Sequence, residues 1–480
     1  MKNIILSLFV LLIAMSTNAQ ELISSELIGN RTQQEIFDEY GFGTYDVDFY
    51  KIVYTTKNAV NEPDTASGLF VVPLDNNLVF PSLIYQHGTV GSREDVPSKL
   101  AGGYQLPMIL ASMGYITTAA DFIGLGDSPG PHPYIHAESE ANAAIDMLIA
   151  VQGLDETLGY HKNEQLFITG YSQGGHAGMA AHWFLERDYA DQFTVTAASH
   201  MSGPYSVSGK MIESTLGDEE YFFVAYLANV AISMKTAYPT MMANYDLANI
   251  FKPEFVPDME KFRNEEIDLF ELNDRLIQLL NDNYGSVKPK FMVQDSILPH
   301  LLAADDHPVP AALKLNDVYD WTPQAPTRLI YCKGDDQVFW ENAELCEQVM
   351  NANGAPEVIA VNKSDTFTHT ECVSPATQTT ILFWLSHQIV STHTEDVSFN
   401  DPSINVFPNP TSDQLSIEFS DDNRIHTIEV YNFFGQKVMR LNNLDASSYK
   451  VDLQDLEQGN YLLLMDTEKG LRSERVLLTR

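Results

Sequence analysis

The pentapeptide Gly170-Tyr171-Ser172-Gln173-Gly174 lies between two segments of different character. The apolar run Leu166-Phe167-Ile168 comes directly before it and predicts a buried strand, and an Ala-rich helical pattern at 175–186 comes directly after it. A G-x-S-x-G sequence in this strand–turn–helix context is typical of a sharp turn that projects the serine hydroxyl from the end of a sheet. Glycines permit such a turn, and the following helix N-terminus stabilises negative charge that develops beside the serine. Because the bare pattern also occurs by chance, the prediction depends on this placement.

Strand-like and helical segments alternate on both sides of this turn, from Tyr45 to about Gln388. Several strand-like runs are almost continuously apolar, which indicates strands buried on both faces. This repetition predicts an α/β domain over 20–390, with a mostly parallel sheet and helices on both of its faces. The expected strands lie at 49–55, 67–72, 82–86, 115–119, 165–169, 194–199, 327–331 and 358–361, and the expected helices at 138–151, 175–186, 341–350 and 375–389.

The alternation stops between Ser202 and Pro326. This segment is rich in Met, Phe, Tyr and acidic residues, shows helical pieces at 221–234 and 265–281, and contains no clear buried strand. A connection of this length inside a compact domain needs a structural role. We therefore expect a helical cap over 205–325 that covers the carboxyl ends of the strands.

Two further segments follow the α/β pattern. The composition becomes polar and loses its helical period at 391–402, which predicts a linker. Short strand-like runs with turns between them then fill 403–480 and predict a small β-sandwich. The runs lie at 415–419, 427–431, 436–440, 449–453, 461–466 and 472–478.

The first residues, 1–19, have the order of a secretory signal peptide. Lys2 supplies a positive charge, 4–14 is apolar, and Thr17-Asn18-Ala19 places small residues before the expected cleavage point. The apolar run is shorter than the roughly 20 residues that a membrane span needs. We expect a mature chain without a transmembrane segment that is secreted or held at the cell surface.

The charge is strongly skewed, with 28 Lys and Arg against 65 Asp and Glu and a net charge of −37. Most of the excess precedes Phe399, because the residues from there onward carry 8 basic and 13 acidic side chains. Such a field disfavours nucleic acid and anionic membrane surfaces as partners. The acidic residues are scattered and not in blocks, so we interpret them as a solvated shell.

The candidate metal-binding and disulfide-forming residues are few. Cys332, Cys346 and Cys372 lack the spacing of a zinc site, and so do His132 and His136. No metal or cofactor is therefore expected. In an oxidising compartment one pair of the three cysteines could form a disulfide, and the sequence leaves the pairing open.

A serine nucleophile needs a base, and the base needs an acid to orient it. The strand at 327–331 leads into Cys332-Lys333-Gly334-Asp335-Asp336-Gln337-Val338, which places two acids at the carboxyl end of a late strand. Asp335 is preferred over Asp336, because the spacing Asp-x-x-Val then leaves Val338 to anchor the loop. The acid is thus expected to be Asp335.

The base is expected in the loop at 366–371, which precedes the last helix and contains a single histidine, His369. The chain order Ser172, Asp335, His369 then matches one of the known orders of a Ser-His-Asp triad. The three histidines nearest to Ser172 in sequence are interpreted as packing or hydrogen-bonded residues. They are His176, His182 and His200.

Backbone N–H groups are expected to stabilise the oxyanion that forms when a serine attacks an acyl carbon. One comes from the residue after the nucleophile, Gln173. The other is expected from His87-Gly88-Thr89, which follows the strand Leu83-Ile84-Tyr85 and places Thr89 beyond a glycine that permits close backbone approach.

With these motifs in place, the segment from about Tyr45 to Gln388 resembles the α/β-hydrolase superfamily, and within it the secretory lipases and related bacterial esterases. Asp121-Phe122-Ile123-Gly124-Leu125-Gly126-Asp127-Ser128 resembles the Asp-Tyr-x-Gly-x-Gly loop of its esterases and peptidases. The resemblance implies acyl transfer through an acyl-enzyme, in which Ser172 attacks, His369 acts as base and then as acid, and Asp335 orients the imidazole. It does not fix the substrate.

The C-terminal segment resembles the type A sorting domain of type IX secretion in three blocks. These are Val406-Phe407-Pro408-Asn409-Pro410, Ile428-Glu429-Val430-Tyr431-Asn432-Phe433-Phe434-Gly435 and Leu456-Glu457-Gln458-Gly459-Asn460-Tyr461. Phe407 departs from the family, in which a tyrosine is usual. The resemblance implies that the type IX secretion machinery is a partner and carries the chain across the outer membrane.

Three functions fit the sequence. The first is a carboxylic-ester hydrolase, such as a lipase or carboxylesterase, that acts on a small-molecule or lipid ester. The second is a secreted serine peptidase of the prolyl-peptidase kind, although the short N-terminal stretch has no room for a propeller. The third is a non-catalytic surface binding protein on a hydrolase scaffold. Apolar residues of the cap could form an acyl pocket or simply its core: Met211, Phe222, Phe223, Tyr226, Met234, Met241 and Met242.

Overall fold

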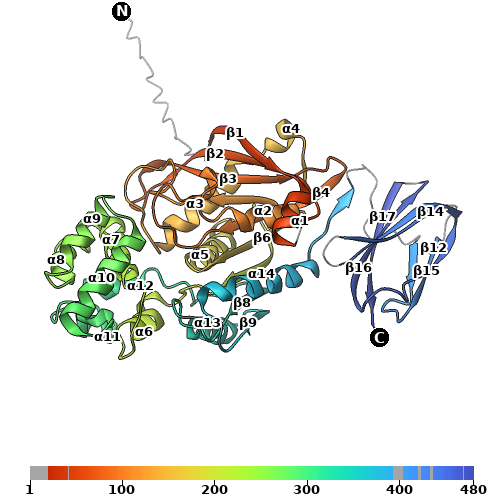
Figure 1. The fold of residues 1–480 in the computed structure, drawn as a ribbon. Coiled ribbons are helices and arrows are strands. Elements are labelled where there is room, and N and C mark those ends of the chain that lie inside the picture. The colour runs from red at the N-terminus through yellow and green to blue at the C-terminus, as the bar shows by residue number, and fades with distance from the viewer. Residues whose placement is uncertain are drawn as a thin grey trace, which may run out of the picture.

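The computed structural model describes residues 20–41, 43–392, 404–419, 423–432, 436–468 and 470–479. The predicted signal peptide, 1–19, and most of the predicted linker, 393–402, therefore lie outside the described residues. The described elements form a large sheet flanked by helices, a group of helices at one end of it, and a smaller β-domain at the other end (Figure 1).

The large sheet has the strand order β1-β2-β3-β5-β4-β6-β7-β8-β9. The strands from β5 to β9 in this order run parallel, and β1, β2 and β3 form an antiparallel edge, which confirms the predicted α/β class. Strand β1 was not predicted, because none of its side chains is buried and it carries no apolar alternation. The strands span Leu22–Arg31 (β1), Val47–Lys57 (β2), Pro63–Pro73 (β3), Leu78–Gln86 (β4), Ile116–Ala120 (β5), His161–Tyr171 (β6), Val195–Met201 (β7), Thr327–Tyr331 (β8) and Val358–Asn362 (β9).

Helices cover both faces of this sheet, because alternate side chains of its strands point to opposite sides. Ile84 and Ile168 pack with α3 and α5, whereas Leu83 and Phe167 pack with α2 and α14. The central strands are thus buried on both faces, as their apolar runs predict. The helices of this domain span Gln33–Tyr40 (α1), Gln105–Ser112 (α2), Ala137–Ala150 (α3), Leu154–Leu158 (α4), Gln173–Asp188 (α5), Glu341–Ala352 (α13) and His369–Leu385 (α14).

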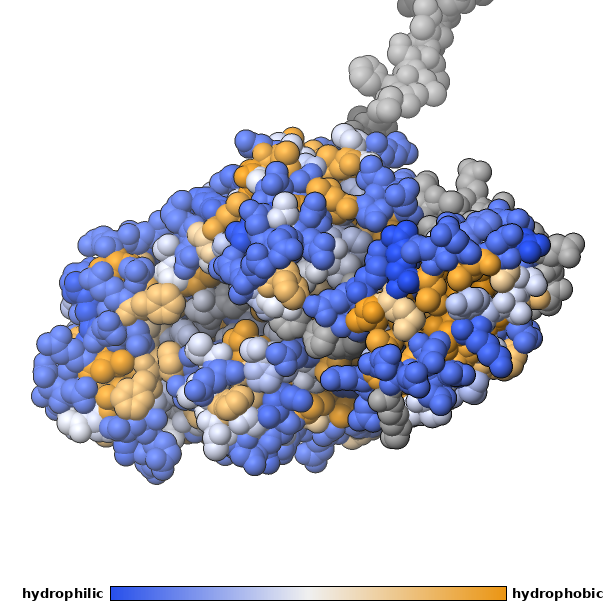
Figure 2. All heavy atoms as spheres, turned by 45° about the vertical axis from the view of Figure 1, so that its right-hand side comes forward, coloured by the Kyte–Doolittle hydropathy of each residue, from blue (hydrophilic) through white to orange (hydrophobic). Residues whose placement is uncertain are grey.

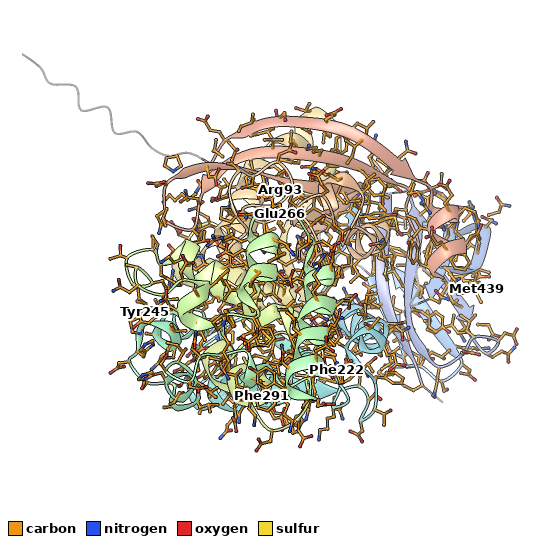
Figure 3. All side chains as sticks on the ribbon, turned by 60° about the vertical axis from the view of Figure 1, so that its left-hand side comes forward. Arg93, Phe222, Tyr245, Glu266, Phe291 and Met439 are labelled. Atoms are coloured by element: carbon orange, nitrogen blue, oxygen red, sulfur yellow. A yellow bond between two sulfur atoms is a disulfide. The ribbon has the colours of Figure 1, made fainter. Side chains whose placement is uncertain are left out.

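A group of helices, which we call the cap, lies between β7 and β8 in the chain. It has a hydrophobic core of its own, to which α10 contributes Leu269, Leu272, Leu276 and Leu280 from a single face. The backbone N–H of Leu269 donates to Gly91 O at 3.0 Å, which fixes α10 to the loop after β4. Figure 3 labels Arg93 of this loop close to Glu266, which lies just before α10. Its helices span Ile212–Thr215 (α6), Ala225–Ala237 (α7), Leu247–Ile250 (α8), Val256–Arg263 (α9), Leu269–Tyr284 (α10), Leu298–Ala303 (α11) and Pro308–Lys314 (α12).

The C-terminal domain is a small sandwich of two antiparallel sheets, β11-β12-β15 and β14-β13-β16-β17, as predicted. Side chains from both sheets, such as Leu415, Val430 and Leu463, share one core. The end of the large domain adds a two-residue strand, Ser391–Thr392 (β10), which pairs with the start of β4, so the predicted linker begins with ordered pairing. The sandwich strands span Ile404–Phe407 (β11), Gln414–Phe419 (β12), Ile425–Asn432 (β13), Lys437–Ala446 (β14), Ser448–Asp452 (β15), Gly459–Thr467 (β16) and Gly470–Leu478 (β17).

The surface is mostly hydrophilic on the face shown in Figure 2. Apolar residues gather there in limited areas. Among the described residues, no helix is both long enough and apolar enough to cross a bilayer.

Candidate active site

Ser172 occupies a strained turn between β6 and α5. Strand β6 ends at Tyr171, α5 begins at Gln173, and Ser172 has φ 61° and ψ −123°, in a region that residues other than glycine rarely adopt. A Cβ at Gly174 would overlap the carbonyl oxygen of Gln86, so the close approach of β4 requires glycine there. The turn therefore holds the serine where strand and helix meet, at the carboxyl end of the parallel sheet.

Asp335 and His369 are in direct contact. Asp335 Oδ2 accepts a hydrogen bond from His369 Nδ1 at 2.7 Å, and both side chains are almost fully buried. Asp335 Oδ1 accepts from the backbone N–H groups of Gln337 at 3.0 Å and Val338 at 2.8 Å. Because a carboxylate accepts, the proton of the neutral imidazole lies on Nδ1 and the lone pair on Nε2. This is the tautomer that a general base needs.

The neighbouring carboxylate of Asp336 makes a different contact. Its Oδ1 accepts from the backbone N–H of His369 at 3.0 Å, whereas the imidazole Nδ1 donates to Asp335. Asp335 is thus the acid beside the ring, and Asp336 holds the N-terminus of α14.

His369 lies in a helix and not in the predicted loop. It is the first residue of α14, which follows the N-cap Thr368 and begins six residues before the helix expected at 375–389. Thr368 and Glu371 form a capping box, in which Thr368 Oγ1 accepts from the Glu371 N–H and Glu371 Oε2 accepts from the Thr368 N–H. The prediction took Pro375 as the start of the helix, whereas Pro375 lies inside it. The sequence Thr-x-x-Glu was the signal that could have located this boundary.

His369 lies beside the turn that holds Ser172. The hydroxyl of Tyr171, the residue before Ser172, donates to the backbone carbonyl of His369 at 2.5 Å. The rings of Tyr171 and His369 are 4.9 Å apart between centroids. Through this pair, β6 and α14 place Ser172 and His369 in one neighbourhood, at a depth where Ser172 is only 8% exposed.

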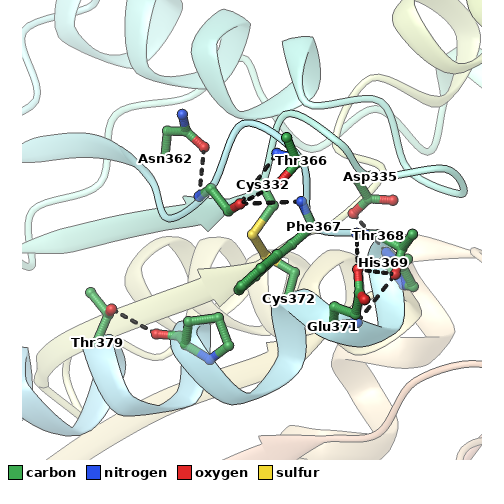
Figure 4. The surroundings of a disulfide bond; sticks show 12 residues. Cys332, Asp335, Asn362, Thr366, Phe367, Thr368, His369, Glu371, Cys372 and Thr379 are labelled. Carbon is green, nitrogen blue, oxygen red and sulfur yellow. Dashed lines mark hydrogen bonds and ion pairs between the residues drawn. A yellow bond between two sulfur atoms is a disulfide. The ribbon is translucent and has the colours of Figure 1, made fainter.

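A disulfide joins the two segments that carry Asp335 and His369 (Figure 4). Cys332 and Cys372 are bonded and fully buried, and Cys346 is a free, buried thiol. Cys332 lies three residues before Asp335, and Cys372 lies three residues after His369. The bond therefore fixes the loop after β8 to the first turn of α14.

Loss of this disulfide is expected to destabilise the large domain. The bond closes a loop with a sequence separation of 40, for which chain entropy gives about 4 kcal/mol. We expect the double variant Cys332→Ala/Cys372→Ala to unfold at clearly lower denaturant concentration, as followed by circular dichroism. Cys346→Ala is the matched control, because it removes a buried thiol that forms no bond. Equal midpoints for the two variants would contradict this role.

Two backbone N–H groups without a protein partner lie beside the serine. In the part of the chain that the structure describes, neither the Thr89 nor the Gln173 N–H donates to another protein group. Strand β4 runs beside β6 with Gln86 opposite Gly170, so the loop that carries Thr89 follows at the level of the turn. A Cβ at Gly88 would lie 3.6 Å from the Ser172 Cβ, which shows how closely this loop approaches. The two N–H groups are available to an oxygen atom near Ser172.

The other histidines that the sequence singled out are engaged in buried contacts. His176 Nδ1 contacts Glu140 at 2.8 Å, and His182 contacts His200 at 3.3 Å between Nδ1 and Nε2. Burial lowers the pKa of His200 well below its usual value. Within the described ranges, His, Cys, Asp and Glu side chains form no group of three that could hold a metal ion.

The named cap residues differ in burial and in what they contact. Met234 and Met242 are buried in the cap core, whereas Phe222 is 52% exposed (Figure 3). Tyr226 reaches the acid loop, where its hydroxyl donates to Gln337 Oε1 at 2.9 Å, and it stacks on Phe223 with 5.7 Å between ring centroids. Tyr226 thus contacts the loop of Asp335 directly, and Phe223 packs behind it.

Sequence reasoning missed Glu140, a carboxylate on α3 that is 1% exposed. Its Oε1 accepts from Gln173 Nε2 at 2.8 Å, and its Oε2 faces His176 Nδ1. Glu138 and Glu140 open a helix in which acidic residues are common, so nothing in the sequence distinguished the buried one.

Comparison with known families identifies the C-terminal segment. Residues 405–479 match the secretion system C-terminal sorting domain, in agreement with the predicted resemblance. A comparison with curated protein sequences gives no match.

Solved structures share the fold of the large domain. The rice cell wall degrading esterase LipA from Xanthomonas oryzae is 25% identical, with a TM-score of 0.66 over 75% of this chain and 95% of that chain. A protein from Legionella pneumophila described as a hydrolase is also 25% identical, with a TM-score of 0.68 over 79% of this chain and all of its own. Candida antarctica lipase A is 18% identical, with a TM-score of 0.54 over 73% of this chain and 77% of its own, and shows the fold alone. The large domain thus has the α/β-hydrolase fold.

Proposed function

We propose that this chain is an exported serine hydrolase that cleaves carboxylic esters with Ser172 as nucleophile, His369 as base and Asp335 as orienting acid. The 2.7 Å contact between Asp335 and His369, beside a serine held at φ 61°, carries the proposal. The likeness to an esterase and to a second hydrolase supports ester cleavage.

The proposed reaction consists of two acyl transfers. Ser172 Oγ attacks the ester carbonyl carbon while His369 Nε2 takes its proton, and the carbonyl oxygen becomes an oxyanion that accepts from the N–H groups of Gln173 and Thr89. The tetrahedral intermediate expels the alcohol, which takes the proton from His369, and leaves an acyl-serine. Water then gives a proton to His369 and attacks the acyl carbon, which releases the carboxylic acid and restores the Ser172 hydroxyl.

Export explains the C-terminal domain. The match at 405–479 indicates a substrate of a secretion system, and its resemblance to type A sorting domains supports the type IX machinery as the partner. The predicted signal peptide at 1–19 would carry the chain across the inner membrane first. We infer that the enzyme acts outside the cell or at its surface, on a small-molecule or lipid ester.

The test compares ester and peptide substrates. We expect residues 20–480 to hydrolyse p-nitrophenyl esters and to leave proline-containing aminoacyl anilides intact. The preferred acyl chain length, measured from acetate to palmitate, then defines the acyl site. Turnover of the anilides alone would replace the esterase with the prolyl-peptidase alternative. Absence of both activities, with no labelling of Ser172 by a fluorophosphonate, would favour the non-catalytic binding protein.

A further inference from the structure

The residue after the nucleophile is held by its side chain as well as by its helix. Gln173 Nε2 carries two hydrogens, and it lies 2.8 Å from Glu140 Oε1 and 2.9 Å from His132 Nε2. His132 Nδ1 lies 2.8 Å from the carbonyl of Ile123 and therefore donates, which leaves Nε2 as an acceptor. Burial lowers the pKa of His132 to about 4, so this acceptor persists at neutral pH. Both hydrogens of the Gln173 amide are thus engaged.

Glu140 is fixed from three directions. Besides Gln173, it accepts from the backbone N–H of Ile135 at 3.1 Å and contacts His176 Nδ1 at 2.8 Å. His176 Nε2 lies 2.8 Å from the carbonyl of Asn316, so both ring nitrogens face oxygen acceptors. Glu140 is thus held in place by a backbone N–H and by a buried histidine ring, and its position in turn fixes the Gln173 side chain.

The same stretch of chain also contacts the second N–H donor. Tyr134 is 5% exposed, and its hydroxyl oxygen is 2.9 Å from Thr89 Oγ1. Its own backbone N–H donates to the carbonyl of His132 at 3.0 Å, and the next residue is Ile135, whose N–H reaches Glu140. The segment 132–140 therefore connects Thr89 to Gln173 through a continuous set of hydrogen bonds.

We propose that His132, Tyr134 and Glu140 form an oxyanion brace, a set of positioning residues that hold the Thr89 and Gln173 N–H groups in a geometry complementary to the tetrahedral intermediate. This inference rests on the proposed hydrolase function. None of the three touches the reacting atoms, and each acts through Thr89 or Gln173. Donors fixed before the reaction stabilise developing charge without reorganisation, which is the largest single contribution in many enzymes.

The test replaces one contact on each side of the brace. Gln173→Met keeps the backbone N–H and loses both side-chain hydrogen bonds, and Tyr134→Phe removes only the hydroxyl that meets Thr89. Loss of a whole oxyanion donor lowers kcat by about 10²–10³-fold, so a misoriented donor should lower it by roughly tenfold or more, with KM nearly unchanged. We expect affinity for an alkyl boronic acid, whose tetrahedral adduct places an oxygen at this site, to fall in parallel.

Matched controls separate positioning from stability. Asp146→Asn alters another buried carboxylate of α3, which accepts from the Thr56 hydroxyl at 2.7 Å, and Tyr54→Phe removes a buried hydroxyl that donates to the carbonyl of Ala143 at 2.8 Å. Both should reduce thermal stability and leave kcat and boronic acid affinity within about twofold. The brace variants should lower kcat and boronic acid affinity well beyond the controls at a similar loss of thermal stability, and Glu140→Gln, which keeps an acceptor for Gln173, should retain more activity than Glu140→Ala.

The rate of fluorophosphonate labelling distinguishes a failure of the hydrolase proposal from a failure of the brace proposal alone. This probe reports the reactivity of Ser172 and the oxyanion site without a correct ester. If the folded wild type does not label at Ser172, the hydrolase proposal and the brace both fall. If the wild type labels, but Gln173→Met and Tyr134→Phe label at its rate and bind the boronic acid equally well, the brace is wrong and the hydrolase stands.

Discussion

Replacement of Ser172 with alanine is expected to lower kcat for p-nitrophenyl esters by about a millionfold, because no other group supplies the attacking oxygen. The substitution leaves the backbone strain unchanged, since alanine and serine tolerate the φ of 61° equally poorly. The fold should therefore persist. Steady-state kinetics and fluorophosphonate labelling, read by mass spectrometry, measure the loss.

Ser112→Ala is the control for this variant. Ser112 is buried on α2, and among the described residues its hydroxyl has no hydrogen-bond partner. Activity should remain close to that of the wild type. If Ser172→Ala kept a substantial fraction of activity while Ser112→Ala behaved normally, the nucleophile would be a different residue.

Replacement of Asp335 with asparagine should lower kcat by roughly ten-thousandfold. The asparagine amide would present an N–H to His369 Nδ1, which would move the imidazole proton to Nε2 and leave no basic nitrogen toward Ser172. Asp336→Asn should cost far less, because the amide oxygen can still accept from the backbone N–H of His369, the contact seen at 3.0 Å. The ratio of kcat between these two variants is the decisive measurement. A larger loss in Asp336→Asn would reassign the orienting acid.

The sequence was most informative where one local pattern implied one geometry. The pentapeptide around Ser172 indicated both the strand that precedes it and the helix that follows it, and the apolar runs indicated a sheet covered on two faces. Strand β1 is not predicted, because it is an exposed edge strand without apolar alternation. Helix α14 begins at His369, six residues before the predicted start at Pro375, because the capping box of Thr368 and Glu371 sets its N-terminus.

The remaining features depend on contacts between distant segments. Nothing in the order of Cys332, Cys346 and Cys372 indicates which two sulfur atoms meet, because that depends on how α14 packs beside β8. The choice between Asp335 and Asp336 likewise depends on which carboxylate the loop turns toward the imidazole. Glu140 could not be identified as buried, because its partners Gln173 and His176 come from another helix 33 and 36 residues away.

The bond between Cys332 and Cys372 makes the stability of the large domain depend on the compartment in which the chain resides. Thiols in the cytoplasm stay reduced, so on the proposed export route the loop of Asp335 and the helix of His369 are held together there only by noncovalent contacts. The covalent closure is added once the chain has entered an oxidising compartment. On this route the free energy of unfolding is therefore lowest while the chain is still in the cytoplasm, and it reaches its full value only after the disulfide has formed outside the cytoplasm.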